Sequence, residues 1–150
     1  MKKSMLWMML CTGFMCTAHS QANDDLVGIW QNIDDKTGSP KALVEISKTP
    51  EGTYVGKVVK ITPRPDYKPQ DKCTKCPGKY KNQPILGLEV FNGLKKVNDN
   101  AYAEGEILDP LSGNIYKLKG KLTGNKKRLH LRGYVGVSAI GRTQTWIRQE

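Results

Sequence analysis

The sequence predicts an all-β fold of about eight short strands, arranged as a barrel or a sandwich. Runs rich in Val, Ile, Tyr and Leu alternate with clusters of turn-forming residues, at the spacing typical of these two architectures. Several runs alternate apolar with polar residues, and no window shows a sustained 3.6-residue period, which argues against helices. The expected strands are residues 26–32, 41–48, 53–62, 85–91, 101–108, 114–122, 128–137 and 142–148.

Turn signals separate most of these strands, because Gly, Asn, Asp and Pro accept the backbone angles that turns require. The run at 85–91 is the least distinctive, since the residues after Pro84 could also begin a short helix. In chain order the turn signals are Asp34–Gly38, Thr49–Gly52, Asn92-Gly93, Asn98–Asn100, Asp109–Gly113 and Thr123–Asn125.

One long segment, residues 63–84, interrupts the strand pattern. It holds five of the eight prolines, which cannot donate to a β-ladder, so we expect a loop. Loops of this length within a domain are often functional or partly disordered. Much of the excess positive charge is also local to this region, and its candidate basic surface is Lys68, Lys72, Lys75 and Lys79.

Residues 1–22 have the pattern of a secretory signal peptide. Lys2 and Lys3 precede an uncharged apolar run that is too short to span a membrane comfortably, and small residues then fit cleavage after Ala22. We therefore expect a single exported domain at 23–150, in the periplasm or cell envelope of a bacterium. Removing residues 1–22 takes away two lysines and no acid, so the net charge falls from +10 to +8.

This positive charge favours acidic partners such as anionic lipid headgroups, lipopolysaccharide phosphates or acidic glycans. A basic surface that only keeps the protein soluble is an equally good interpretation. Nucleic acid is not expected as a partner, because the compartment argues against it and no nucleic-acid-binding motif is present.

Cys73 and Cys76 form a C-x-x-C pair, the only cysteines after residue 22. Export to an oxidising compartment favours a disulfide, and a structural clip at the loop tip is the leading interpretation. A redox-active pair activated by nearby lysines and an attachment point for a metal or cofactor are the alternatives. Pro77 stands where haem attachment needs a histidine, and no cofactor is predicted.

No set of residues in the sequence adds up to an enzyme. His130 lies between two leucines of an expected strand, where a structural or exposed histidine is more common than a catalytic one. Ser138 resembles a nucleophile elbow only loosely, since its second glycine is one residue late. One remaining histidine and two cysteines also make a closed zinc site of the usual kind unexpected.

The last two strands combine arginines with a tryptophan. Because strand side chains alternate, Arg142, Gln144, Trp146 and Arg148 share one face, and Trp146 argues that this face is inward. In 128–137, Leu129 and Leu131 argue that their own face is the core. Buried arginines need acceptors. They either tie strands together as structural groups or serve as donors for a ligand. The ligand-binding candidates are Arg132, Tyr134, Arg142 and Gln144.

Gly28-x-Trp30 in the first strand, with Arg148 able to stack on the tryptophan, resembles the calycin pattern of lipocalin-like barrels. The whole chain resembles more specifically the exported bacterial family called domain of unknown function 2147. The matching pieces are GIWQNIDDKTGSPKALVEI, CTKC, ILDPLSG with Tyr116, and LRGYVGVSAIGRTQTWIR.

This resemblance implies a small antiparallel up-and-down barrel of about eight strands and an envelope location, and no activity. Gly28, Trp30, Trp146 and Arg148 are then the expected structural closure of the barrel. Since the sequence ends at Glu150, we expect no helix packed outside the barrel and no deep, lidded pocket.

Three functional hypotheses follow. The leading one is a non-catalytic binding module for a small anionic or amphipathic ligand, held inside a barrel just wide enough for one. The second is an interaction or scaffold protein whose basic loop contacts anionic lipid, lipopolysaccharide or glycan. The third is a redox helper that uses the cysteine pair.

Overall fold

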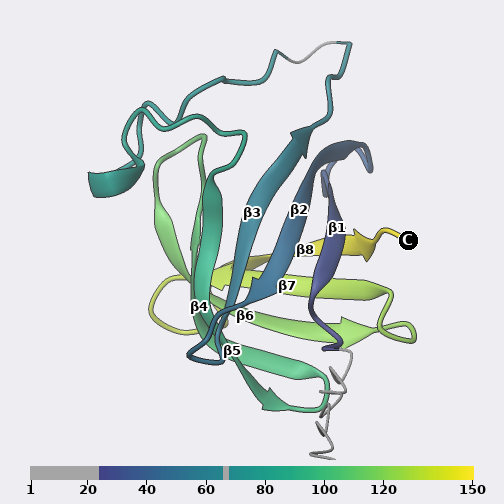
Figure 1. Cartoon of the computed structure of the whole chain (residues 1–150). Coiled ribbons are helices and arrows are strands. Elements are labelled where there is room, and N and C mark those ends of the chain that lie inside the picture. Colours follow the sequence, from purple (N-terminus) through teal and green to yellow (C-terminus); the bar gives the residue numbers. More distant parts are fainter. Residues whose placement is uncertain (1–23, 66–67) are drawn as a thin grey trace, which may run out of the picture.

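The computed structural model describes residues 24–65 and 68–150, and the expected signal peptide lies outside the described residues. Eight antiparallel strands follow one another around a closed barrel, in which β8 pairs with β1 (Figure 1). The all-β prediction is confirmed, and the architecture is the barrel. The strands are β1 (Gly28–Ile33), β2 (Pro40–Lys48), β3 (Tyr54–Ile61), β4 (Glu89–Asn98), β5 (Ala101–Leu108), β6 (Ile115–Thr123), β7 (Arg128–Tyr134) and β8 (Gly141–Arg148).

The fourth strand differs most from its prediction. Residues 85–88 make a turn, in which the Leu88 amide donates to the Ile85 carbonyl, so β4 begins only at Glu89. The expected turn at Asn92-Gly93 lies inside β4, because Gly93 adopts a φ of 69° and the strand continues instead of reversing. The expected strand 128–137 likewise ends at 134.

Large side chains form a core in the part of the barrel where β1 begins and β8 ends. Trp30, Tyr54 and Tyr102 are at most 1% exposed, and the rings of the two tyrosines meet edge to face at 5.4 Å. Gly56 makes room for Phe91, whose ring would lie 2.3 Å from a Cβ at that position. Tight packing of this kind fixes the strands that carry the other half of the barrel.

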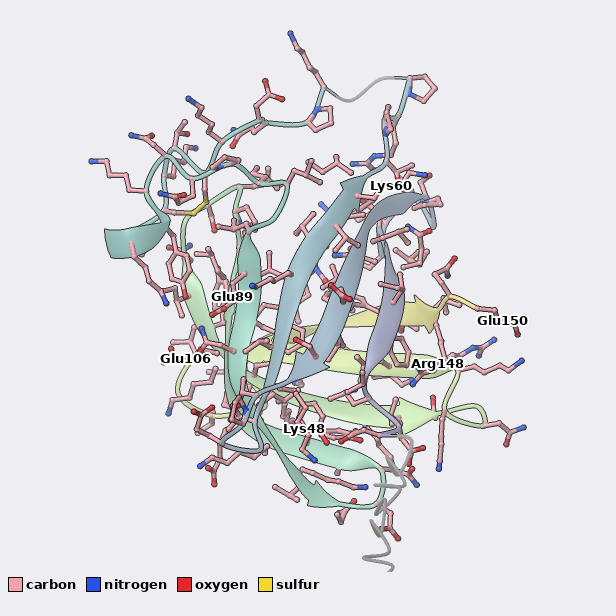
Figure 2. The ribbon with its side chains drawn as sticks, viewed as in Figure 1. Lys48, Lys60, Glu89, Glu106, Arg148 and Glu150 are labelled. Carbon is pink, nitrogen blue, oxygen red and sulfur yellow. A yellow bond between two sulfur atoms is a disulfide. The ribbon has the colours of Figure 1, made fainter. Side chains whose placement is uncertain are left out.

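The two ends of the barrel are built differently. The β2–β3, β4–β5 and β6–β7 connections are short and lie at one end, here called the closed end, where β1 begins and β8 ends. The β1–β2, β3–β4, β5–β6 and β7–β8 connections lie at the other, here called the open end. Figure 2 marks the two ends of the β2–β3 hairpin by Lys48 near the bottom and Lys60 near the top.

The long β3–β4 connection is folded back on itself. Residues 71–73 pair with 82–85, and a 3-10 helix, Gly78–Tyr80, lies between them. Cys73 and Cys76 form a disulfide and are at most 3% exposed. The loop docks on the β5–β6 turn so closely that a Cβ on Gly113 would lie 2.0 Å from the Lys75 carbonyl oxygen. The disulfide therefore belongs to a packed corner at the open end, consistent with the structural clip.

Among the described residues, no helix has the length and apolar character needed to cross a membrane.

Candidate functional site

Arg148 seals the closed end. Its guanidinium carbon lies 4.3 Å from the centre of the Trp30 ring, and its nitrogens donate to the carbonyls of Asp25, Val27 and Lys126. The Trp30 indole in turn donates to the Leu26 carbonyl at 2.9 Å. These bonds satisfy the arginine within the protein, so the structure assigns Arg148 to the frame of the barrel.

Gly28 is part of the same arrangement. Its φ of 141° is rarely adopted by other residues, and a Cβ there would lie 2.8 Å from Nη1 of Arg148. The segment before β1 is anchored by Asp24, which accepts hydrogen bonds from the Tyr54 hydroxyl at 2.7 and 2.9 Å. Burial acts to raise the pKa of Asp24, but hydrogen bonds from Tyr54 and Lys48 outweigh burial, and the pKa is lowered.

A cavity of about 450 Å³ occupies the upper half of the barrel and reaches the open end. Its size is within the range of small-molecule binding sites. Trp146, 1% exposed, and the buried Val44 and Leu131 form its deep walls. The β3–β4 connection contributes Pro69 and Ile85 to its upper wall. The expectation of no deep pocket is therefore wrong, because the loop that bounds the cavity meets the barrel only in the folded chain.

Two polar side chains, Gln144 and Asn32, lie next to the apolar deep wall of the cavity. Gln144 accepts a hydrogen bond from the Trp146 indole at 3.2 Å, and its amide nitrogen has no partner among the described residues. Asn32 also lies in the wall, and its Oδ1 is buried without a hydrogen-bond partner in the described part of the chain. Sparse polar groups in an apolar wall are the usual means of orienting a bound molecule.

The rim of the cavity carries three cations, each next to a carboxylate of the β1–β2 turn. Arg142 binds Asp35 through two of its nitrogens, with Nε 2.6 Å from Oδ2. Arg64 lies 3.3 Å and Lys41 3.8 Å from Asp34. The hydrogen bond from Arg142 lowers the pKa of Asp35. This belt of ion pairs links β8, β2 and the start of the β3–β4 connection to one turn at the mouth.

Asp34 is the centre of that turn. Its Oδ1 accepts the amides of Lys36 and Thr37 at 2.9 and 3.1 Å, which is the Asx-turn role expected of an aspartate in a turn signal. Those two backbone bonds, with Lys41 and Arg64 nearby, lower the pKa of Asp34 from its ordinary 3.8 to about 2.

Replacing Asp34 by Asn is expected to lower the melting temperature at pH 7, with the gap to the unchanged protein closing between pH 4 and pH 2. A carboxyl whose pKa is depressed by folding stabilises the protein above its unfolded pKa, and this contribution is lost as the pH falls through the folded value of about 2. Thermal unfolding at half-unit pH steps measures it. Asp99→Asn, in the β4–β5 turn, is the matched control. A gap of constant size down to pH 2 would contradict the assignment.

Three of the four ligand-binding candidates meet at the cavity. Arg142 and Gln144 line it from β8, and Tyr134 lines it from the end of β7. The structure does not bring Arg132 to the cavity. It lies on the outer face of β7, where it donates to the carbonyls of Ser138 and Ala139 and to the Thr143 hydroxyl. Alternation along the strand sends Arg132 outward when Leu131 points inward.

Of the four closure candidates, Trp146 lies apart. Gly28, Trp30 and Arg148 meet at the closed end, whereas Trp146 packs 6.2 Å from Phe91 and forms part of the cavity wall. The register explains the separation, because Trp146 pairs with Asn32, two residues further along β1 than the Trp30–Arg148 pair and towards the open end.

The residues weighed for catalysis are distant from the cavity or engaged elsewhere. His130 bridges Thr123 and Thr145 on the outer face of β7, at 2.9 and 3.0 Å. Ser138 lies in the β7–β8 loop, with its carbonyl held by Arg132. Within residues 24–65 and 68–150, no group of three or more His, Cys, Asp or Glu is arranged to hold a metal ion.

The basic loop residues Lys68, Lys72, Lys75 and Lys79 are exposed, and they do not line the cavity. None of them forms an ion pair with a carboxylate among the described residues, although Lys79 lies over the ring of Tyr80.

Sequence reasoning missed Asn32, Lys41 and Arg64 at the cavity. The sequence offered one weak signal, for Asn32. It lies two residues after Trp30, so strand alternation places both side chains on the inward face of the first strand. Arg64 comes from the long loop, whose path the sequence does not specify.

Comparison with known proteins agrees with the geometry. The model of the family described as "Uncharacterized protein conserved in bacteria (DUF2147)" matches residues 28–148. Among solved structures, the chain is similar to one described as "Protein HP1028 from the human pathogen Helicobacter pylori belongs to the lipocalin family". The two are 21% identical, the match covers 83% of each chain, and the TM-score is 0.70. This likeness shows a lipocalin-like fold. No curated protein matches the sequence.

Proposed function

The chain belongs to the bacterial family DUF2147, and from its lipocalin-like barrel we propose that it is an exported cell-envelope protein that binds a small amphipathic molecule, without catalysing a reaction on it. The observation that carries this proposal is the cavity of about 450 Å³ in the upper half of the barrel. Location in the envelope is supported by the signal-like residues 1–22.

The walls of the cavity fit the apolar part of such a molecule. The deep part is surrounded by four residues that are each at most 4% exposed: Val44, Val58, Leu131 and Trp146. Burying a ligand's hydrocarbon against such walls stabilises the complex by about 25 cal/mol per Å² of apolar surface removed from water.

The rim fits a polar or anionic head. Arg142 uses Nε and Nη2 on Asp35, and its Nη1 has no hydrogen-bond partner among the described residues. Its side chain is 59% exposed, so an incoming oxygen can reach it. Lys41, whose Nζ is 3.8 Å from Asp34, is the second donor at the rim. Because the carboxylates offset most of this charge, we expect the apolar contact to dominate the affinity.

Native mass spectrometry of purified protein tests the proposal. We expect a second population, heavier by the mass of a co-purified small amphipath, that loses this mass on activation in the gas phase. In Arg142→Ala the heavier population is expected to fall several-fold while the melting temperature changes little, because an exposed ion pair contributes about 0–1 kcal/mol to folding.

Arg128→Ala, an exposed arginine at the closed-end side of β7, is the matched control and should retain the ligand. If Arg142→Ala unfolds the protein instead, the arginine is a structural group. If the protein carries no adduct and takes up none from a panel of fatty acids and lysophospholipids, the binding function itself is wrong.

The exposed lysines of the β3–β4 connection support a second candidate function, a scaffold that contacts anionic lipid or glycan. Lys68, Lys72 and Lys75 have no acidic partner among the described residues. Salt-sensitive binding that is lost when these lysines and Lys79 are changed to Gln would favour it.

A further inference from the structure

Exposed apolar side chains are concentrated at the mouth of the cavity. Of the nine large hydrophobic residues that the described part of the chain exposes, five lie in the β5–β6 turn, the start of β6 and the β7–β8 loop. They are Leu111, Ile115, Val135, Val137 and Ile140, between 41% and 68% exposed. Three of them, Leu111, Val135 and Ile140, also line the cavity.

The β7–β8 loop is held in a defined shape. Val135 donates to the Ile140 carbonyl at 3.2 Å, and Ile140 donates to the Val137 carbonyl at 3.1 Å. Arg132 fastens the loop from outside, with Nε 2.6 Å from the Ser138 carbonyl oxygen. The loop is therefore a fixed turn that presents apolar side chains to solvent. Grouped exposed apolar side chains of this kind mark surfaces that a partner covers.

The strands behind this loop carry unpaired positive charge. On the outer faces of β6 and β7 five cations lie close together by register, since Lys119 is opposite Arg132 and Lys121 is opposite His130. None of the five forms an ion pair with a described carboxylate, and Glu106, opposite Lys117, does not bond to it. These cations are Lys117, Lys119, Lys121, Arg128 and Arg132.

We propose that the open end docks on an anionic lipid surface, with Val137 and Ile140 inserted at the headgroup boundary and Lys117 and Lys119 over the headgroups. Apolar tips next to a basic face are the combination that binds lipid interfaces. A second copy of this chain is a poor occupant, because it would bring the same cations together. Docking places the cavity mouth against the lipid. The docking itself does not depend on the proposed function, whereas the passage of a ligand between the lipid and the cavity does.

Vesicle co-sedimentation tests the docking. The probes are vesicles of phosphatidylglycerol with phosphatidylethanolamine, and vesicles of phosphatidylcholine alone, with purified protein whose N-terminus has been checked by intact mass. We expect binding to the anionic vesicles only, weakened by salt. Val137→Asp should reduce the affinity about tenfold or more, since it removes an apolar side chain that would be inserted in the lipid and adds a charge that the anionic lipid repels.

Val97→Asp is the matched control, because Val97 is 55% exposed on β4 near the closed end. The double variant Lys117→Gln/Lys119→Gln should bind anionic vesicles more weakly and with a smaller salt dependence. The control double variant Lys57→Gln/Lys96→Gln should bind as the unchanged protein does. In a Val137→Trp variant, tryptophan emission should shift to the blue on anionic vesicles, and in Val97→Trp it should not.

Equal loss of binding in Val137→Asp and Val97→Asp, or no loss in either, overturns the proposal. Loss only when Lys68, Lys72, Lys75 and Lys79 are changed assigns binding to the β3–β4 connection and also overturns it. Binding to polyglutamate in the absence of vesicle binding points to an acidic protein instead. Because vesicle binding and ligand retention are separate measurements, a protein that holds a ligand but ignores vesicles refutes the docking alone.

Discussion

Trp30→Ala is expected to destabilise the protein by about 3–5 kcal/mol, the usual range for removing a buried tryptophan. Trp30 is fully buried, bonds to the Leu26 carbonyl and is covered by the Arg148 guanidinium. Its loss opens the closed end, where Tyr54 and Tyr102 complete the core. Domains of this size are commonly stable by about 5–15 kcal/mol, so a large share of the stability disappears. Urea unfolding followed by far-ultraviolet circular dichroism measures the change.

Arg148→Lys is the informative companion to that variant. Lysine keeps the charge but cannot reach three carbonyls at once or lie flat on an indole, so we expect a smaller loss of about 1–3 kcal/mol. Lys127→Ala, an exposed neighbour in the β6–β7 turn, should change stability by no more than about 0.5 kcal/mol. An Arg148→Lys variant as stable as the unchanged protein would show that charge alone matters at this position.

Ala42→Trp is expected to weaken ligand binding strongly without unfolding the barrel. Ala42 lines the cavity from β2, and its small side chain leaves the space in front of it open. An indole there occupies the volume that the ligand needs. The dye 1-anilinonaphthalene-8-sulfonate, an anionic amphipath, serves as the probe, and we expect its dissociation constant to rise about tenfold or more. The melting temperature should stay within a few degrees.

Ala103→Trp is the matched control, because Ala103 lies on β5 outside the cavity. It should bind the dye as the unchanged protein does. Equal affinities in the two variants would mean that the dye binds outside the barrel. A large fall in melting temperature in Ala42→Trp alone would mean that the upper barrel is less open than the cavity volume indicates.

Alternation and turn chemistry predict most of the barrel. Strand β2 was expected at 41–48 and spans Pro40–Lys48, and β5 was expected at 101–108, where it lies. The failure at β4 has a physical cause. Asn92-Gly93 has the composition of a hairpin turn, but Phe91 fills the space left by Gly56, and this packing keeps the chain in the sheet through Gly93. Contacts between distant segments overrode the local preference.

The site was less accessible to prediction than the fold. Strand parity places Arg142 and Gln144 on the inward face of β8, but it cannot say that Asp35 holds one of them at the rim. Parity also sends Arg132 outward once Leu131 is buried, which separates it from the other candidates. Lys41 and Arg64 reach the rim through the Asp34 turn, and no sequence pattern encodes that meeting.

The closing pairs of the barrel join the two extremes of the described chain. Trp30 is paired with Arg148, Asn32 with Trp146, and the Gln149 amide donates to the Ile29 carbonyl. A polypeptide threaded from its N-terminus, through a ribosome or a translocation pore, therefore keeps Trp30 uncovered until residue 148 has emerged. The barrel therefore closes only after residue 148 has been delivered, and a chain truncated before residue 146 would keep β1 paired with β2 alone.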